Sequence, residues 1–286
     1  MLYVINFADK GFAQQQQDNT RSAYKKGKAD KVIEYHPDDI DKSFIEANPG
    51  VFKFLDRGYG LWIWKAYFIS KTLENLSAGD YLFYCDSGSY FINDIHILIK
   101  IMEEKAIDLM PFELPLLEFQ WTKREAYDKM GISDFSRNQV LAGYILLKKS
   151  QFTVSFFKEW LICMTDLQLS SPEMQTSTSN FENFITHRED QAVFSLLVHK
   201  HQLEVFRDPS QFGEWPWLYN IEDKIIFHPK KYSNSPYPRI IVSNRRILAK
   251  KFRRTMFLKN VIDSVGLYKP IYDVKKKITI WLKEMF

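Results

Sequence analysis

The residue whose position points most directly to chemistry is Asp86. It follows Tyr81–Cys85 (YLFYC), an apolar run without polar alternation, which predicts a central parallel strand covered on both faces. In open α/β sheets ligands bind beyond the carboxyl ends of the strands, so a carboxylate there could orient a ligand. Ser87 and Gly88 come next and are small enough to allow close approach. The alternative is an Asx turn that caps the next helix.

A cationic and aromatic segment, residues 57–67, precedes that strand. It contains Arg57, Tyr59, Trp64 and Lys65 around paired glycines. A helix that begins after a glycine-containing turn presents free backbone N–H groups to an anion. Arg57 and Lys65 could neutralise phosphates, and Tyr59 or Trp64 could stack on a base or a sugar. The alternative is that the tryptophan belongs to the core.

The elements that must position these residues alternate along the chain. Apolar runs predict strands at 2–7, 31–35, 81–85, 107–110, 139–147 and 203–206. Helical spacing predicts helices at 11–29, 61–76, 92–105, 150–167 and 188–201, and the Ser/Thr-rich residues 170–180 predict an exposed loop. Alternating strands and helices favour an α/β fold with a mostly parallel sheet.

Five segments in this order carry a family resemblance. They are the N-terminal strand, RGYGLWIWKAYFISKTL (57–73), GDYLFYCDSGSYF (79–91), NQVLAGYILLKKS (138–150) and HREDQAVFSLL (187–197). The layout resembles that of bacterial GT-A glycosyltransferases of polysaccharide and lipopolysaccharide biosynthesis, which are similar to glycosyltransferase family eight. The resemblance covers about residues 1–207. It implies a Rossmann-like GT-A sheet, a nucleotide-sugar donor and a hydroxyl of a glycan or glycolipid as acceptor.

The resemblance also implies a set of site residues. Its motifs map the phosphate-binding and donor-binding positions to Arg57, Lys65, Asp86, Ala142, Gly143, Asp190 and Gln191. The residues after the first strand usually hold the nucleotide base, which implicates Phe7, Ala8 and Asp9, while Gln139 could reach the sugar. Asp190 would bind hydroxyls or serve as the base for the attacking hydroxyl, with Gln191 as a sugar ligand. Helix capping is the alternative for Asp190, because acidic side chains favour a first turn.

The motif at Asp86 departs from the family pattern. It reads Asp86-Ser87-Gly88, so the second acid that usually chelates a divalent cation is absent. Asp86 could still bind Mn²⁺ or Mg²⁺ together with diphosphate oxygens. Otherwise the enzyme is metal-independent and uses Lys65 or Arg57, because a fixed cation must stabilise the charge that develops on the diphosphate. A late histidine, His228, resembles a metal ligand of some related transferases.

The charge is unevenly distributed. Residues 245–286 contain twelve Lys or Arg and three acidic residues, a net charge of +9, so the other 244 residues carry −5 of the total of +4. We therefore expect a catalytic domain at 1–244 and a basic amphipathic helical tail at 245–286. Such helices bind the headgroup region of anionic membranes, which would suit a lipid-linked acceptor. Plain packing on the domain and binding of nucleic acid are the alternatives, the last being the least favoured.

Composition excludes several classes of protein. Hydrophobic residues at 45% and charged residues at 26% exclude a disordered chain, and two cysteines exclude a disulfide scaffold and a tetrathiolate zinc site. The first nine residues lack the features of a signal peptide, and no apolar run is long enough to span a membrane. We expect a cytoplasmic protein, with the inner face of the membrane as the place where the tail would bind.

Two other functions fit parts of this pattern. A nucleotidyltransferase shares the sheet architecture, but it would normally show a glycine-rich, cationic loop after its first strand, which Gly11 alone does not supply. A non-enzymatic nucleic-acid-binding protein would use the basic tail and exposed aromatic residues.

Overall fold

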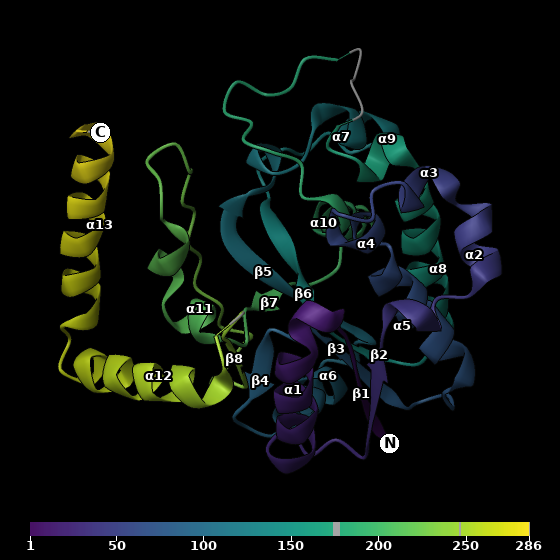
Figure 1. Cartoon of the computed structure of the whole chain (residues 1–286), viewed down its shortest axis with the longest axis horizontal. Coiled ribbons are helices and arrows are strands. Elements are labelled where there is room, and N and C mark those ends of the chain that lie inside the picture. Colours follow the sequence, from purple (N-terminus) through teal and green to yellow (C-terminus); the bar gives the residue numbers. More distant parts are fainter. Residues whose placement is uncertain (174–177, 246, 286) are drawn as a thin grey trace.

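The computed structural model describes residues 1–173, 178–245 and 247–285. Its centre is a six-stranded sheet in the order β2-β1-β3-β6-β5-β7, and a separate two-stranded sheet pairs β4 with β8 (Figure 1). The strands are β1 (Leu2–Phe7), β2 (Lys31–Tyr35), β3 (Tyr81–Cys85), β4 (Ser89–Phe91), β5 (Leu109–Leu117), β6 (Asn138–Lys148), β7 (Phe206–Arg207) and β8 (Ile241–Ser243).

The large sheet is mixed, with more parallel than antiparallel pairings. β1 pairs in parallel with both β2 and β3, and β5 pairs in parallel with β7. β6 is antiparallel to its two neighbours, β3 and β5. The predicted α/β fold with a mostly parallel sheet is confirmed, and the predicted central strand, β3, lies between β1 and β6.

Helices cover both faces of the sheet, with α5, α8 and α10 on one face and α1 and α6 on the other. The helices of the described residues are α1 (Ala13–Lys25), α2 (Lys42–Ala47), α3 (Pro49–Phe52), α4 (Gly58–Leu61), α5 (Trp64–Asn75), α6 (His96–Glu104), α7 (Arg124–Met130), α8 (Gln151–Thr165), α9 (Leu167–Ser170), α10 (Glu189–Lys200), α11 (Gln211–Glu214), α12 (Ala249–Ser264) and α13 (Tyr268–Met285). Short 3₁₀ turns occur at η1 (Lys10–Phe12), η2 (Pro37–Asp39), η3 (Glu118–Gln120) and η4 (Pro216–Tyr219).

The apolar sequence of β3 is explained by two cores. Leu82 and Tyr84 belong to the core that also contains buried residues of α5, α8 and α10. Phe83 and Cys85 point to the other face, into the core shared with α6 and α1. Since successive side chains of a strand alternate between faces, a strand covered on both sides must be apolar throughout.

Several predicted elements differ in extent from the structure: the predicted helices 11–29 and 92–105 are shortened to α1 (Ala13–Lys25) and α6 (His96–Glu104). β5 extends to Leu117, beyond the predicted end at Met110. The prediction stopped early because Pro111 and Pro115 interrupt the apolar pattern of the strand. The pairing of β5 with β6 is irregular between Met110 and Leu117. The predicted strand 203–206 is reduced to Phe206–Arg207. Residues 174–177 of the predicted loop 170–180 lie outside the described residues, and Ser170 is the buried end of α9.

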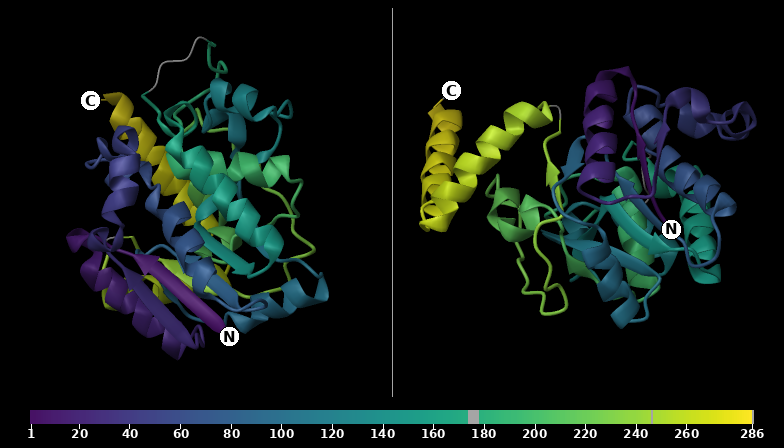
Figure 2. Two further views of the ribbon diagram at one scale, coloured as in Figure 1. Left: turned by 90° about the vertical axis from the view of Figure 1, so that its right-hand side faces the viewer. Right: turned by 90° about the horizontal axis from the view of Figure 1, so that it is seen from below.

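The C-terminal residues form two long helices at one side of the molecule. α12 and α13 meet at an angle, and α13 lies at the edge furthest from α2 and α8 (Figures 1 and 2). A small apolar cluster joins them to the body through Tyr90 and Trp215, which pack with Met256 and Tyr268. Among the described residues, none of the helices has the length and apolarity needed to cross a membrane.

Candidate active site

The site is organised by one buried ammonium group. The Nζ atom of Lys65, in the first turn of α5, lies 2.9 Å from Oδ2 of Asp190 and 3.4 Å from Oδ1 of Asp86. The side chains of Lys65 and Asp190 are 7% and 8% exposed, whereas that of Asp86 is 44% exposed. The predicted cation and both predicted carboxylates therefore meet at one place, where Asp86 faces solvent.

Burial and ion pairing act against each other at this cluster. Burial alone would lower the pKa of Lys65, but Asp190 and Asp86 outweigh it, and the pKa is raised. Burial raises the pKa of Asp190 in spite of the attraction of Lys65. Lys65 is thus held as a fixed positive charge in a low-dielectric environment, where a cation interacts strongly with an arriving anion.

Asp86 is oriented by two residues of neighbouring strands. Tyr84, two residues earlier on the same face of β3, donates its hydroxyl hydrogen to Oδ1 of Asp86. On the other side, Gly143 of β6 accepts a hydrogen bond from the backbone N–H of Asp86 at 2.9 Å. A Cβ atom on Gly143 would lie only 3.0 Å from Oδ2 of Asp86. The absence of a side chain at residue 143 lets the carboxylate lie against the strand.

A chain of amides connects β6 to α10. Gln191 donates its side-chain N–H to Oε1 of Gln139 at 2.8 Å, and Arg188 donates to the same oxygen at 3.0 Å. The backbone N–H of Ala142 in turn donates to Oε1 of Gln191 at 3.4 Å. Gln139 is fully buried, whereas Gln191 is partly exposed. The predicted residues Gln139, Ala142 and Gln191 thus form one network, and Gln191 is next in sequence to Asp190.

Arg57 reaches the site through a residue that the motif analysis did not select. Its guanidinium contacts Oε1 of Glu189 at 2.5 and 2.6 Å, and its side chain is 45% exposed. Burial raises the pKa of Glu189 to about 7, against the opposing effect of Arg57. Glu189 also has a positive φ of 28°, an unfavourable backbone conformation for a residue with a side chain. Arg57 therefore lies next to the carboxylate cluster, paired with Glu189.

The short segment α4 before α5 has left-handed backbone angles and forms a turn, which explains why α5 starts later than predicted. The backbone φ angles of residues 58 to 62 are all positive, between 52° and 89°. The predicted helix 61–76 therefore begins at Trp64, which puts Lys65 in the first turn. Tyr59 lies within this left-handed turn and is partly exposed. Trp64 is buried, donates to the carbonyl of Gly58 at 2.8 Å and stacks on Phe7 with ring centroids 3.9 Å apart.

The residues expected at the nucleotide base lie around the end of β1. Phe7 and Ala8 are buried, and Asp9 is exposed and accepts a hydrogen bond from the backbone N–H of Gly11. Ser87 donates its hydroxyl hydrogen to the carbonyl of Phe7 at 2.5 Å, which joins the end of β1 to the residues after β3.

Gly88, the residue after Ser87, contacts the backbone of residues 244 and 245. The carbonyl of Gly88 accepts hydrogen bonds from the backbone N–H groups of Asn244 and Arg245, at 2.9 and 2.7 Å. A Cβ atom on Gly88 would lie 3.0 Å from the Cα atom of Arg245. Gly88 thus permits close approach, and the approaching group in this structure is the chain itself.

The site has few oxygen atoms that could bind a divalent cation. Oδ1 of Asp86 is engaged by Tyr84 and Lys65, which leaves Oδ2 for a metal ion. Within residues 1–173, 178–245 and 247–285, no group of three or more His, Cys, Asp or Glu side chains could hold a metal. The ring Nδ1 of His228 contacts Oδ1 of Asn138 at 2.8 Å. Because Mg²⁺ is often held by one or two carboxylates plus substrate phosphates, these residues fit a cation that a diphosphate brings with it.

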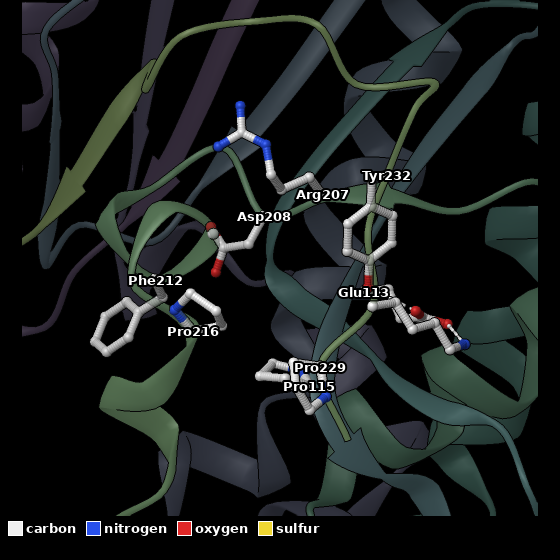
Figure 3. A pocket seen from close by; sticks show the side chains of 10 residues that line it. Glu113, Pro115, Arg207, Asp208, Phe212, Pro216, Pro229 and Tyr232 are labelled. Atoms are coloured by element: carbon white, nitrogen blue, oxygen red, sulfur yellow. Dashed lines mark hydrogen bonds and ion pairs between the residues drawn. The ribbon is translucent and has the colours of Figure 1, made fainter. Parts of the chain in front are cut away.

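A small pocket lies elsewhere, beside β5 and β7 (Figure 3). Its lining includes Glu113, Asp208 and Tyr232, and its cavity volume of about 30 Å³ suffices for about one water molecule. Glu113 already accepts hydrogen bonds from Tyr232 at 2.6 Å and Lys230 at 2.9 Å. Asp208 accepts a hydrogen bond from the backbone N–H of Ser210 at 2.7 Å. We do not regard this pocket as a ligand site, because it is small and both of its carboxylates have partners.

Three residues at the site were not selected from the sequence. Tyr84 could have been found from its place two residues before Asp86, because alternate residues of a strand share a face. Arg188, whose guanidinium lies 3.7 Å from the ring centroid of Trp121, directly precedes the acidic pair Glu189 and Asp190. The third residue is Glu189. Its pairing with Arg57 joins distant parts of the chain, so no local sequence pattern predicts it.

Comparisons with known proteins yield structural likenesses alone. No family model matches the chain, and no curated protein matches it. Solved structures that match include glycosyltransferases. The apo form of glycosyltransferase GlyE from Streptococcus pneumoniae TIGR4 is 14% identical, with 85% of this chain and 54% of that chain covered and a TM-score of 0.40. This chain therefore spans about half the length of GlyE.

Two further structures match over most of their own length. Mouse xyloside xylosyltransferase 1 is 9% identical, with 85% of this chain and 96% of that chain covered and a TM-score of 0.43. Galactosyltransferase LgtC, solved with donor and acceptor sugar analogues, is 12% identical, with 84% and 86% covered and a TM-score of 0.45.

Proposed function

We propose that this protein is a glycosyltransferase that moves a sugar from a nucleotide-diphosphate donor to a hydroxyl of a glycan or glycolipid. The observation that carries the proposal is the contact of Lys65 with both Asp86 and Asp190 at the carboxyl end of β3. This is the edge at which open α/β sheets bind ligands. A fixed cation suits the negative charges of a nucleotide sugar, and two carboxylates beside it can accept hydrogen bonds from the sugar hydroxyls.

Each group has a role that follows from the reaction. Transfer breaks the bond between the anomeric carbon and the diphosphate and forms a bond to the acceptor oxygen, which loses its proton. Negative charge therefore develops on the diphosphate, and the buried ammonium of Lys65 would stabilise it. Asp190 and Gln191 would hold sugar hydroxyls, because both are anchored and lie beside Asp86. Arg57, half-exposed beside Glu189, would attract the phosphates from outside.

Other parts of the donor site are assigned by position. We assign Phe7, Ala8 and Asp9 to the nucleotide base, because they follow β1 and Ser87 connects them to Asp86. We assign Mn²⁺ or Mg²⁺ to Oδ2 of Asp86, held jointly with the diphosphate oxygens. Such an ion, when bound, would add positive charge at the leaving group.

The acceptor and the place of action form the outer part of the proposal. We propose a glycan or lipid-linked glycan acceptor and action in the cytoplasm at the inner face of the membrane. The support is the charge of +9 in residues 245–286, which suits an anionic membrane surface. A role in polysaccharide or lipopolysaccharide synthesis would follow from such an acceptor.

A thermal-shift screen tests the donor assignment. The full chain is heated with a panel of nucleotide sugars, each with and without Mn²⁺, and with the corresponding nucleoside diphosphates. We expect at least one nucleotide sugar to raise the Tm, because ligands that bind the native state stabilise it. Asp86→Asn should abolish this shift. Asp94→Asn is a matched control, since Asp94 has a similarly exposed side chain (42%) outside the site.

Two outcomes would contradict the proposal. The first is the absence of a shift with any nucleotide or nucleotide sugar. The second is a shift that Asp86→Asn and Asp94→Asn leave equally intact, which would place the nucleotide away from β3. For the donor that is found, release of the nucleoside diphosphate then measures turnover.

A further inference from the structure

The outer surface of α12 carries large apolar side chains in contact with water. Phe257, Leu258, Val261 and Val265 are 67%, 60%, 49% and 65% exposed. Their spacing places them on one side of the helix. Met256 on the opposite side is 4% exposed and packs into the cluster with Tyr90 and Trp215. The helix is therefore fixed to the body by one face while a second apolar face is left uncovered.

α13 repeats this arrangement. Leu267, Ile271, Val274 and Ile278 follow helical spacing and are 53%, 51%, 58% and 52% exposed. A different side of the helix is anchored, because Tyr268 is buried against Trp215. Among the described residues, ten of the sixteen exposed large hydrophobic side chains lie between 247 and 278. Soluble surfaces rarely gather apolar residues in this way without a binding partner.

The charges beside these apolar residues are mostly positive. Lys250, Lys251 and Arg254 on α12 are exposed, as are Lys269, Lys275 and Lys277 on α13. The acidic residues between 247 and 280 are Asp263, which is partly exposed, and Asp273, whose side chain is 46% exposed. Each is engaged within the protein, Asp263 with Trp215 at 2.8 Å and Asp273 with Lys269 at 2.7 Å. Within residues 247–280, exposed cations therefore outnumber carboxylates, and both carboxylates already have a partner.

This combination selects one kind of partner. An anionic lipid surface offers negative headgroups to the cations and an acyl boundary to the apolar side chains. A second copy of the chain would bring the same positive charges together, which opposes self-association. Nucleic acid would satisfy the cations but would leave the aliphatic side chains in water.

We propose that α12 and α13 form a membrane-docking surface that binds the anionic face of a bilayer, with the side chains of Phe257, Leu258, Val261, Val265, Val274 and Ile278 inserted at the headgroup boundary. Because the opposite face of α12 is packed on the body, docking would hold the whole molecule in one orientation. The proposal is independent of the catalytic assignment, since it rests on a surface remote from Lys65.

Vesicle co-sedimentation of the full chain tests the proposal. The vesicles are pure phosphatidylcholine, or phosphatidylcholine and phosphatidylglycerol at about three to one. We expect binding to the anionic vesicles, at least ~10-fold weaker binding to the neutral ones, and partial weakening in ~0.5 M salt. The triple variant Phe257→Ser, Leu258→Ser, Val261→Ser and the charge variant Lys250→Glu, Lys251→Glu, Arg254→Glu should each bind at least ~10-fold more weakly.

Matched variants separate docking from general surface effects. Ile162→Ser removes an apolar side chain that is 69% exposed on α8. Arg21→Glu reverses a cation that is 62% exposed on α1. Both should bind anionic vesicles as the unmodified chain does, and circular dichroism should report a folded protein for every variant. The apolar variant keeps all cations of the tail. Its failure to bind vesicles would therefore show that insertion of the apolar side chains is needed in addition to electrostatic attraction.

Three results would overturn the proposal. One is equal binding to neutral and anionic vesicles, or to neither. Another is vesicle binding that the two tail variants leave unchanged. The third is a dimer in light scattering that the apolar variant converts to a monomer while vesicle binding is absent, which would assign the surface to a second copy. Retention on DNA without vesicle binding would likewise assign it to nucleic acid.

Discussion

The ammonium of Lys65 and the carboxylate of Asp190 form an ion pair at 2.9 Å in which both side chains are nearly inaccessible to solvent. Asp86, whose side chain is more exposed, contacts the same ammonium at 3.4 Å. Burying two charges costs free energy that their attraction only partly offsets, so such a pair indicates a functional demand more than a gain in stability.

Replacing Lys65 by Met should strongly lower the stability of the protein. Removal of one partner of a buried ion pair leaves an uncompensated charge and costs about 3–5 kcal/mol. We expect the free energy of unfolding of Lys65→Met to fall by about that amount in denaturant titration. Lys71→Met is the control on the same helix, because Lys71 is 34% exposed and pairs with Asp41 at the surface. Its loss should cost at most about 1 kcal/mol. Equal losses in the two variants would contradict this account of the pair.

The pKa of Glu189 predicts a pH-dependent stability. It is raised to about 7 by burial, with Arg57 and Arg188 opposing and Asp190 reinforcing. Between the ordinary glutamate pKa of 4.5 and the raised pKa of about 7, the native state binds the proton more tightly than the unfolded chain does. Glu189 therefore lowers stability progressively as the pH rises through this window, by about 3 kcal/mol in total.

Glu189→Gln isolates this contribution because glutamine resembles the protonated acid. Relative to the unmodified protein, the variant should gain stability between pH 4.5 and 8, as measured by urea unfolding at a series of pH values. Glu182→Gln changes an exposed carboxylate nearby and should show no such trend. A stability difference for Glu189→Gln that is flat with pH would count against the raised pKa.

Gly143→Ala should impair turnover more than folding. The added Cβ would lie 3.0 Å from Oδ2 of Asp86, so the carboxylate must move. The required shift is a few tenths of an ångström. Since a misplacement of about 1 Å can cost ~100-fold in rate, we expect this smaller shift to lower turnover with the donor found in the screen by up to ~10-fold.

A second glycine provides the control for that substitution. Gly131 has a φ of +68° and no atom within 4 Å of an added Cβ. Gly131→Ala should therefore lose about 1 kcal/mol of stability through backbone strain and keep its activity. A reversal of these two results would show that the space beside Asp86 is not critical.

Metal and nucleotide should bind cooperatively. The site offers one unengaged carboxylate oxygen, Oδ2 of Asp86, so Mn²⁺ alone should change the Tm very little. With a nucleoside diphosphate present, Mn²⁺ should tighten nucleotide binding in calorimetry, and Asp86→Asn should remove this increment. Tight binding of Mn²⁺ to the nucleotide-free protein would contradict the inferred donor set.

Local sequence determined the elements and several positions of the site. The unbroken apolar run of β3 required helices on both faces, and Asp86 had to leave the sheet where that run ends. The helical spacing of 188–201 correctly predicted α10 and put Asp190 in its first turn. These features follow from side-chain periodicity over a few residues, which a sequence displays directly.

Tertiary structure decided which of those groups act on one another. That Lys65 contacts both Asp86 and Asp190 depends on the packing of α5 and α10 against β3 and β6. The reversed direction of β6 and the burial of Trp64 on Phe7 also depend on contacts between distant segments. The sequence predicted basic amphipathic helices at 245–286. The packing of α12 on the body determines which of their apolar residues are covered. Burial and ion pairing arise from proximity in space, and the order of residues along the chain does not encode that proximity locally.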